Sequence, residues 1–231
     1  AIATQIATLK KEKAKGRSRK KVLPKDIASV LARKLSIDAN LLLSNEWEQL
    51  KTLASRLKKT VIGQDSAIDR IVQSLRQAHL GIGRTERPLA SFLFTGPSGV
   101  GKTKLAQSLA QELYFDKRAL IRIDMTEFAE AHGVSKLLGS PAGYVGYKER
   151  NRFLDAIQSR PYSVVLFDEF DKAHADVRKL LYQILDEGSL TDSAGKKISI
   201  AHATIVLTSN TGQEFFRRGN LAFGNSEDIA A

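Results

Sequence analysis

Cysteine is absent from the 231 residues of this chain, and methionine and tryptophan each occur once. Without cysteine the chain can form neither disulfides nor thiolate–zinc sites, which fits a reducing compartment, and we expect a cytoplasmic location. No segment approaches the roughly 18 apolar residues that a membrane-spanning helix needs, and no signal peptide is visible at the start. We therefore expect no membrane partner. Apolar residues form 42% of the sequence, enough for one globular α/β domain and a smaller appendage.

The positive charge of the chain is unevenly distributed. Its formal net charge is +11, and residues 10–21 alone, with eight lysines or arginines and one glutamate, carry +7 of it. Such a run fits a solvated linker or helix end, and it also fits a contact with nucleic acid or another acidic partner. Because most of the excess lies in one short segment, the charge gives little support to a nucleic-acid-binding surface.

The sequence changes its pattern near residue 91. Before it, apolar residues recur at helical spacing, and after it short apolar runs alternate with helical patterns, which predicts a doubly wound α/β fold with a mainly parallel sheet. Each apolar helix face is most simply buried on a neighbour. The expected helices are 2–9, 26–35 (with Ile27, Val30, Leu31 and Leu35 on one side), 45–57, 65–80, 105–113, 149–159 and 175–185, and the expected strands are 91–95, 119–123, 163–167 and 203–208.

A glycine-rich motif with the pattern G-x-x-x-x-G-K-T follows the first expected strand directly. In this context it predicts a phosphate-binding P-loop, because glycines let backbone N–H groups point at a polyphosphate. The lysine can reach the β- and γ-phosphates, and the threonine hydroxyl can bind Mg²⁺. We therefore expect ATP and Mg²⁺ as ligands. The motif comprises Gly96, Pro97, Ser98, Gly99, Val100, Gly101, Lys102 and Thr103.

Two acids, Asp168 and Glu169, follow the apolar run 163–167. Carboxylates at the end of a buried strand are unfavourable unless they meet a cation or solvent. Mg²⁺ on a nucleotide would supply the cation. We predict that Asp168 holds Mg²⁺ through its water shell and that Glu169 orients and deprotonates the attacking water.

Asn210 follows the last expected strand. Its side chain could hydrogen-bond the γ-phosphate or the water, or it could cap a helix that begins at Thr211. A functional role is favoured because the strands before Thr95, Asp168 and Asn210 end at the same edge of a parallel sheet, where ligands bind in such folds. Asp171 and Lys172 follow closely, and we expect them to be surface or subunit-contact residues. The four histidines show no metal-binding spacing.

Residues 139–147 read GSPAGYVGY and place Tyr144 and Val145 between glycines. So many glycines disfavour a helix or a central strand and indicate a loop with an aromatic tip. This loop could be an ordinary turn with a tucked tyrosine. It could also grip another chain through apolar contact without requiring a particular sequence.

Together these motifs resemble the Clp family of AAA+ protein unfoldases, in particular the second ATPase domain of its two-ring members ClpA, ClpB and ClpC. The resemblance covers roughly residues 22–224. The matching residues are Val61–Asp65, Gly96–Thr103, Ile123–Phe128, the segment 139–147, Arg160–Ser163, Asp168 and Glu169 with Lys172–His174, Leu190–Asp192 and Thr208–Asn210.

The resemblance implies roles for individual residues. Val61 and Ile62 match the segment that packs on adenine, and Asn210 matches the first sensor. Tyr144 and Val145 match the axial pore loop that pulls substrate polypeptide through a ring, and 191–197 match a second pore loop. Residues Leu221–Gly224 resemble a tip that docks a ClpP-type peptidase, with alanine in place of the first glycine. The chain also departs from the family at Arg150 and Asn151, where two glycines are usual.

The resemblance further implies a domain plan and a function. Residues 1–21 would be a basic helical or linker segment, 22–58 a helical connector, and 59–231 the large nucleotide-binding subdomain of an AAA+ module. In a homohexamer it would hydrolyse ATP to thread unfolded or aggregated polypeptides. The family's arginine finger, second-sensor arginine and helical lid match no residue up to Ala231, so we expect the chain alone to bind nucleotide weakly, hydrolyse it slowly and form no stable ring.

Two other functions remain open from the sequence alone. One is an AAA+ ATPase that acts with nucleic acid, such as a helicase loader or initiator, and uses residues 10–21. The other is a regulatory or scaffold module that binds nucleotide without hydrolysing it. Intact Lys102, Asp168 and Glu169 argue against the second.

Overall fold

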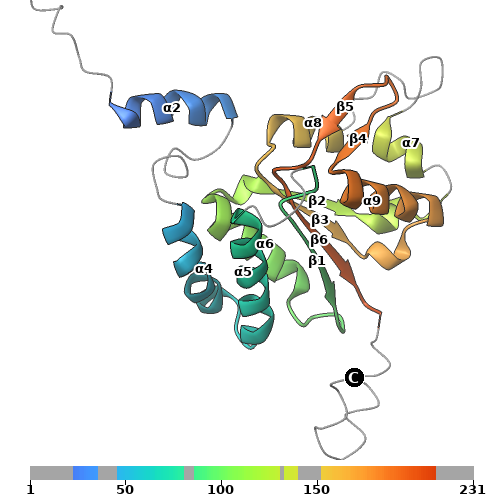
Figure 1. The fold of residues 1–231 in the computed structure, drawn as a ribbon. Coiled ribbons are helices and arrows are strands. Elements are labelled where there is room, and N and C mark those ends of the chain that lie inside the picture. The colour runs from blue at the N-terminus through green and yellow to red at the C-terminus, as the bar shows by residue number, and fades with distance from the viewer. Residues whose placement is uncertain (1–22, 36–45, 81–85, 131–132, 140–151, 212–231) are drawn as a thin grey trace, which may run out of the picture.

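A four-stranded parallel sheet forms the centre of the computed structural model, which describes residues 23–35, 46–80, 86–130, 133–139 and 152–211 (Figure 1). Its strand order is β1-β6-β3-β2. The strands are β1 (Ala90–Thr95), β2 (Leu120–Asp124), β3 (Val164–Asp168) and β6 (Thr204–Ser209). Each lies within a residue or two of its predicted range, so the predicted parallel α/β fold is confirmed.

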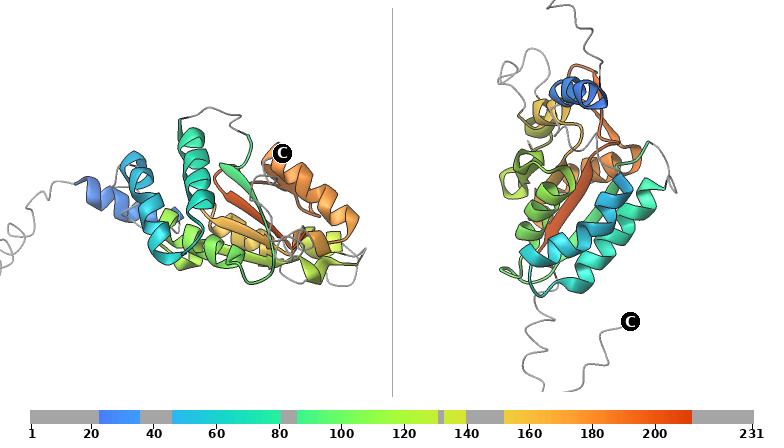
Figure 2. Two further views of the ribbon diagram at one scale, coloured as in Figure 1. Left: turned by 90° about the horizontal axis from the view of Figure 1, so that it is seen from below. Right: turned by 90° about the vertical axis from the view of Figure 1, so that its left-hand side faces the viewer.

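Helices cover both faces of this sheet, as Figure 2 shows. One face packs Leu166 and Val206 against α4, α5 and α6, and the other packs Val165 and Ile205 against α7, α8 and α9. The helices are α2 (Pro24–Leu35), α4 (Glu46–Thr60), α5 (Asp65–His79), α6 (Lys102–Tyr114), α7 (Gly133–Leu138), α8 (Arg152–Ser159) and α9 (Ala175–Glu187). None of the described helices has the length and apolar character to cross a membrane.

Strands β3 and β6 are buried along their whole length. Burial on both faces explains why residues 163–167 read as an almost continuous apolar run. Each leucine, isoleucine or valine side chain buried there contributes about 1.5–3 kcal/mol. The two strands are therefore rigid supports for whatever follows their carboxyl ends.

The predicted burial of the apolar face of residues 26–35 is wrong where the structure describes it. In α2 the side chains of Ile27 and Val30 are 53% and 67% exposed, whereas Ala28 and Ala32 are buried. The helix lies away from the sheet (Figure 1), so its large apolar side chains have no core to enter. Periodicity identifies a helix with an apolar face, but it does not identify what covers that face.

The structure also contains a small antiparallel hairpin that was not predicted from the sequence. It pairs β4 (Ser189–Thr191) with β5 (Lys197–Ser199). In the turn, the Asp192 carboxylate accepts hydrogen bonds from the backbone N–H groups of Ala194 (2.9 Å) and Lys196 (2.8 Å). Three-residue strands are too short to show an alternating pattern, which explains the omission.

Gly188 joins α9 to this hairpin in a left-handed conformation with φ of 59°. A Cβ atom at this position would lie 1.5 Å from the carbonyl oxygen of Glu86. Gly195 in the hairpin turn also has positive φ (81°), but a Cβ atom there would meet nothing within 4 Å.

We therefore expect Gly188→Ala to destabilise the fold far more than Gly195→Ala. Gly195→Ala, the control, should lower the free energy of unfolding by about 1 kcal/mol from backbone strain alone, or Tm by roughly 2–4 °C. Gly188→Ala adds a backbone clash and should lose about 3 kcal/mol. Thermal unfolding followed by circular dichroism measures both, and equal losses would contradict the packing described here.

Candidate functional site

The carboxyl ends of β3 and β6 and the start of α6 surround one cavity of about 290 Å³. Parallel strands place these ends at the same edge of the sheet. The predicted residues Lys102, Thr103, Asp168, Glu169 and Asn210 all line it. Its other lining residues are Ser98, Gly99, Gly101, Lys104, Arg122 and Thr208.

The glycine-rich loop turns sharply between β1 and α6. Gly96, Gly99 and Gly101 have φ values of 144°, 84° and 99°. Side chains rarely adopt such angles, so conformation rather than lack of space requires glycine at Gly99 and Gly101, where a Cβ atom would meet nothing within 4 Å. The loop ends at the N-terminus of the 13-residue helix α6, whose free N–H groups and dipole favour an anion.

The Lys102 ammonium group is held by acceptors of the protein. It donates to the carbonyl oxygens of Gly96 (2.7 Å) and Pro97 (2.8 Å) and to Oδ1 of Asn210 (2.8 Å). Burial lowers the pKa of Lys102, and the charges of Asp168, Asp171 and Glu169 oppose this effect. The lysine thus connects the glycine-rich loop with the end of β6.

Asp168 is buried, with 6% of its surface exposed. Its Oδ1 accepts a hydrogen bond of 2.6 Å from the Thr208 hydroxyl, and its Oδ2 lies 2.7 Å from a guanidinium nitrogen of Arg122. The Thr103 hydroxyl lies 3.3 Å from the same Oδ2. Sequence analysis found Thr103 and Asp168 but missed Arg122 and Thr208, which neighbouring strands supply.

Glu169 occupies a left-handed backbone conformation, with φ of 54° and ψ of 46°. This conformation costs roughly 1–2 kcal/mol for a residue with a side chain, and such strain gathers at functional sites. The backbone N–H of Glu169 donates to the Thr208 hydroxyl at 2.9 Å. That hydroxyl therefore fixes both acids of the turn, because it donates to Asp168 and accepts from Glu169.

Asp171 does not behave as the surface residue that we expected. It lies in the short 3₁₀ helix η3 (Phe170–Lys172), and its carboxylate accepts a 3.3 Å hydrogen bond from the backbone N–H of Asn210. Burial raises the pKa of Asp171, but hydrogen bonds from Ser209 and Asn210 outweigh burial, and the net pKa is lowered. Lys172 is exposed over 56% of its side chain, as expected.

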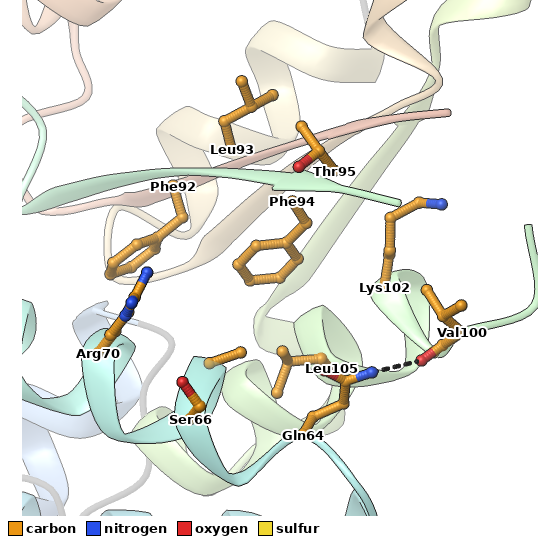
Figure 3. Close-up of a pocket in the computed structure, with 12 residues that line it drawn as sticks. Gln64, Ser66, Arg70, Phe92, Leu93, Phe94, Thr95, Val100, Lys102 and Leu105 are labelled. Atoms are coloured by element: carbon orange, nitrogen blue, oxygen red, sulfur yellow. Dashed lines mark hydrogen bonds between the residues drawn. The ribbon is translucent and has the colours of Figure 1, made fainter. Parts of the chain in front are cut away.

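A second cavity, of about 440 Å³, borders the glycine-rich loop on the side of β1 (Figure 3). Phe92 and Phe94 point into it from β1 and stack with ring centroids 6.3 Å apart. The Gln64 amide donates to the Val100 carbonyl at 3.2 Å and ties the start of α5 to the loop. Its lining residues are Gln64, Ser66, Ala67, Arg70, Phe92, Leu93, Phe94, Thr95, Val100, Gly101, Lys102 and Leu105.

In the sequence, Val61 and Ile62 come shortly before the first residue that lines this second cavity, Gln64. The two side chains differ in exposure. Val61 is buried in the core beside α4 and α5, whereas Ile62 is 90% exposed. Tyr144, Val145 and the segment Leu221–Gly224 lie outside the described residues.

The donor set suits a magnesium nucleotide. A hydroxyl (Thr103) and a carboxylate (Asp168) face one another, and oxygen ligands of this kind are what Mg²⁺ requires. Within the part of the chain that the structure describes, no three histidine or acidic side chains gather into a metal cluster. One carboxylate and one hydroxyl still suffice, because Mg²⁺ keeps several waters and takes further ligands from phosphates.

Comparison with known proteins identifies a family that matches most of this chain. The family described as AAA domain (Cdc48 subfamily) matches residues 87–227. Chaperone protein ClpB of Rickettsia bellii is 45% identical over 213 residues, which cover 92% of this chain and 25% of that protein. ClpB2 of rice, a chloroplastic chaperone, is 42% identical over 221 residues, which cover 93% of this chain and 23% of that protein.

A protease subunit is similar to the same degree. The ATP-dependent Clp protease ATP-binding subunit ClpE of Lactococcus lactis is 45% identical over 191 residues, which cover 83% of this chain and 26% of that protein. The chain thus spans about a quarter of the length of the curated relatives that it matches.

We expect Thr208→Val to destabilise the acidic turn. Valine keeps the shape of threonine but leaves the N–H of Glu169 and Oδ1 of Asp168 without this partner, a loss of about 1–3 kcal/mol. Ser163→Ala is the matched control, because the buried Ser163 hydroxyl makes no hydrogen bond within the described structure. Urea unfolding measures both variants, and equal midpoints would contradict the role given to Thr208.

Proposed function

Because this chain belongs to the family described as AAA domain (Cdc48 subfamily), we propose that the cavity at the ends of β3 and β6 binds MgATP and hydrolyses it. The single observation that carries this proposal is the convergence of Lys102, Thr103, Asp168, Glu169 and Asn210 on one cavity. These residues lie up to 108 positions apart in the chain. A glycine turn alone would bind phosphate, whereas this group also offers a base and a polar sensor.

In this proposal, each residue of the site has a separate role in hydrolysis. Backbone N–H groups at the N-terminus of α6 bind phosphate oxygens, and Lys102 exchanges its carbonyl partners for the β- and γ-phosphates. Thr103 and Asp168 would hold Mg²⁺, which neutralises charge on the phosphate oxygens when bound. The Glu169 carboxylate orients a water and accepts its proton. Asn210 hydrogen-bonds the γ-phosphate or that water.

We place the nucleoside on the other side of the glycine-rich loop. The second cavity shares Gly101 and Lys102 with the first, so a nucleotide can lie across the loop between them. Its apolar wall suits the flat face of a base. The exposed side chain of Ile62 would cover the adenine, and Val61 would support it from the core.

We further propose that the longer protein is a ring-forming unfoldase or disaggregase. This rests on similarity to proteins named ClpB chaperones and to a protease subunit named ClpE. In it Tyr144 and Val145 would bind unfolded or aggregated polypeptide in the pore of a homohexamer, and Leu221–Gly224 would contact a ClpP-type peptidase. Because these relatives carry chaperone and protease-subunit names, the nucleic-acid alternative is not favoured.

In the longer protein, Glu169→Gln should keep nucleotide binding and lose hydrolysis. A glutamine side chain cannot accept the proton of the water, so turnover should fall by at least about 100-fold. Binding of a fluorescent ATP analogue and release of phosphate measure the two properties separately. Lys102→Ala should instead lose binding.

The matched control is Glu127→Gln, which makes the same change at an exposed position in the 3₁₀ helix η2 (Met125–Phe128). It should alter neither property. Unchanged hydrolysis in Glu169→Gln would exclude Glu169 as the base.

Tyr144→Ala should separate hydrolysis from work on substrate in the longer protein. Removal of an aromatic side chain far in sequence from the glycine-rich loop should leave ATP turnover within about twofold, whereas apolar grip on the polypeptide should fall. Unfolding of a fluorescent substrate protein measures the second effect. Unimpaired unfolding by Tyr144→Ala would remove the pore-loop assignment.

A further inference from the structure

Arg122 reaches the Asp168 carboxylate from the neighbouring strand. It lies in β2, which pairs in parallel with β3. One of its guanidinium nitrogens is 2.7 Å from Oδ2 of Asp168, and its side chain is 50% exposed whereas that of Asp168 is 9% exposed. Arg122 also lines the 290 Å³ cavity. The residue therefore joins a buried acid to the open side of the site.

A buried carboxylate needs a compensating charge. Within the described structure, the polar contacts of the Asp168 carboxylate come from Thr103, Thr208 and Arg122, and Arg122 is the one cation among them. Lys102 is directed instead at the carbonyl oxygens of the glycine-rich loop and at Asn210. Arg122 is therefore the direct ion-pair partner of Asp168.

The two oxygens of Asp168 differ in their closest partners. Oδ1 accepts a 2.6 Å hydrogen bond from Thr208, and Oδ2 pairs with the cation, at 2.7 Å from Arg122. The Thr103 hydroxyl, the other expected Mg²⁺ ligand, lies about equally near both oxygens, 3.3 Å from Oδ2 and 3.4 Å from Oδ1. The guanidinium group of Arg122 and a magnesium ion with its water shell would therefore compete for this carboxylate.

We propose that Arg122 is an internal counter-ion that holds Asp168 in the metal-free site and that Mg²⁺ must displace. This inference rests on the proposed MgATP site. Exchange of one cation for another keeps the buried acid neutralised throughout. It also raises the Mg²⁺ concentration at which the site fills, because metal binds only the fraction of molecules in which the arginine has left.

Arg122 has a place to move when it is displaced. Its side chain is half exposed and flexible, and Asp124 lies two residues further along the same face of β2. A hydrogen bond from the Thr126 side chain chiefly lowers the pKa of Asp124, and the charge of Arg122 also lowers it. The Asp124 carboxylate can therefore receive the guanidinium group on this face of β2.

The test compares Arg122→Met with the parent chain in two measurements. Methionine keeps an apolar stem but has no charge. Without nucleotide or metal, the Tm of Arg122→Met should fall by roughly 2–4 °C, because the buried Asp168 loses its direct ion-pair partner. In a MgCl₂ titration at a fixed concentration of fluorescent ATP analogue, its apparent Mg²⁺ affinity should rise roughly three- to tenfold.

Two further variants make the result specific. Arg118→Met removes an arginine that is 82% exposed and pairs with Asp116 just before the same strand, and it should change neither quantity. Arg122→Lys keeps a cation and should fall between the parent and Arg122→Met. It also serves as the test variant if the methionine variant does not fold.

The two proposals fail in different ways. A parent chain that binds the ATP analogue equally well with and without MgCl₂ overturns the MgATP site, and this inference with it. If the parent responds to Mg²⁺ but Arg122→Met binds the ion no more tightly than the parent, only the counter-ion role is overturned. A weaker affinity in that variant would show that Arg122 helps bind the metal complex.

Discussion

The hydroxyl of Thr208 links the two strands on which the site depends. It comes from the buried end of β6, donates to the Asp168 carboxylate at 2.6 Å and accepts the N–H of Glu169 at 2.9 Å. Two adjacent acids, to which we assign different roles, are thereby fixed by one atom. The left-handed turn at Glu169 persists because this hydrogen bond and the buried strands on both sides offset its strain.

Around this turn, the charged side chains of the site have partners within the protein. Lys102 donates to two carbonyl oxygens of the glycine-rich loop and to Asn210, and Arg122 pairs with Asp168. A ligand therefore replaces existing contacts and does not enter a set of unpaired groups. Only the difference between the new and the old contacts appears as affinity, which favours a polyphosphate with Mg²⁺ because it can replace both sets at once.

Residues of the candidate site can be predicted from sequence where chemistry and chain order coincide. Glycines with positive φ, a lysine and a hydroxyl stand together in Gly96–Thr103, so their pattern is visible in one segment. Asp168 and Asn210 were predicted because each follows a buried apolar strand, and the structure places both at one cavity. Arg122 was not predicted, because it lies in mid-strand and resembles an ordinary exposed residue until β2 is placed beside β3. The helical periodicity of α2 was correct, but its apolar face has no partner in the described structure.

The sequence alone determined the fold class, the glycine-rich loop and the position of the two acids, because these depend on local conformation and on the order of strands along the chain. Tertiary structure decided which strand lies next to which, and with it the partners of Asp168. Strand neighbours are chosen by packing across the whole sheet, so β2 contributes Arg122 and β6 contributes Thr208 to a turn that follows β3. Local sequence does not reveal which strands become neighbours, because the contacting residues lie about 40 positions or more apart.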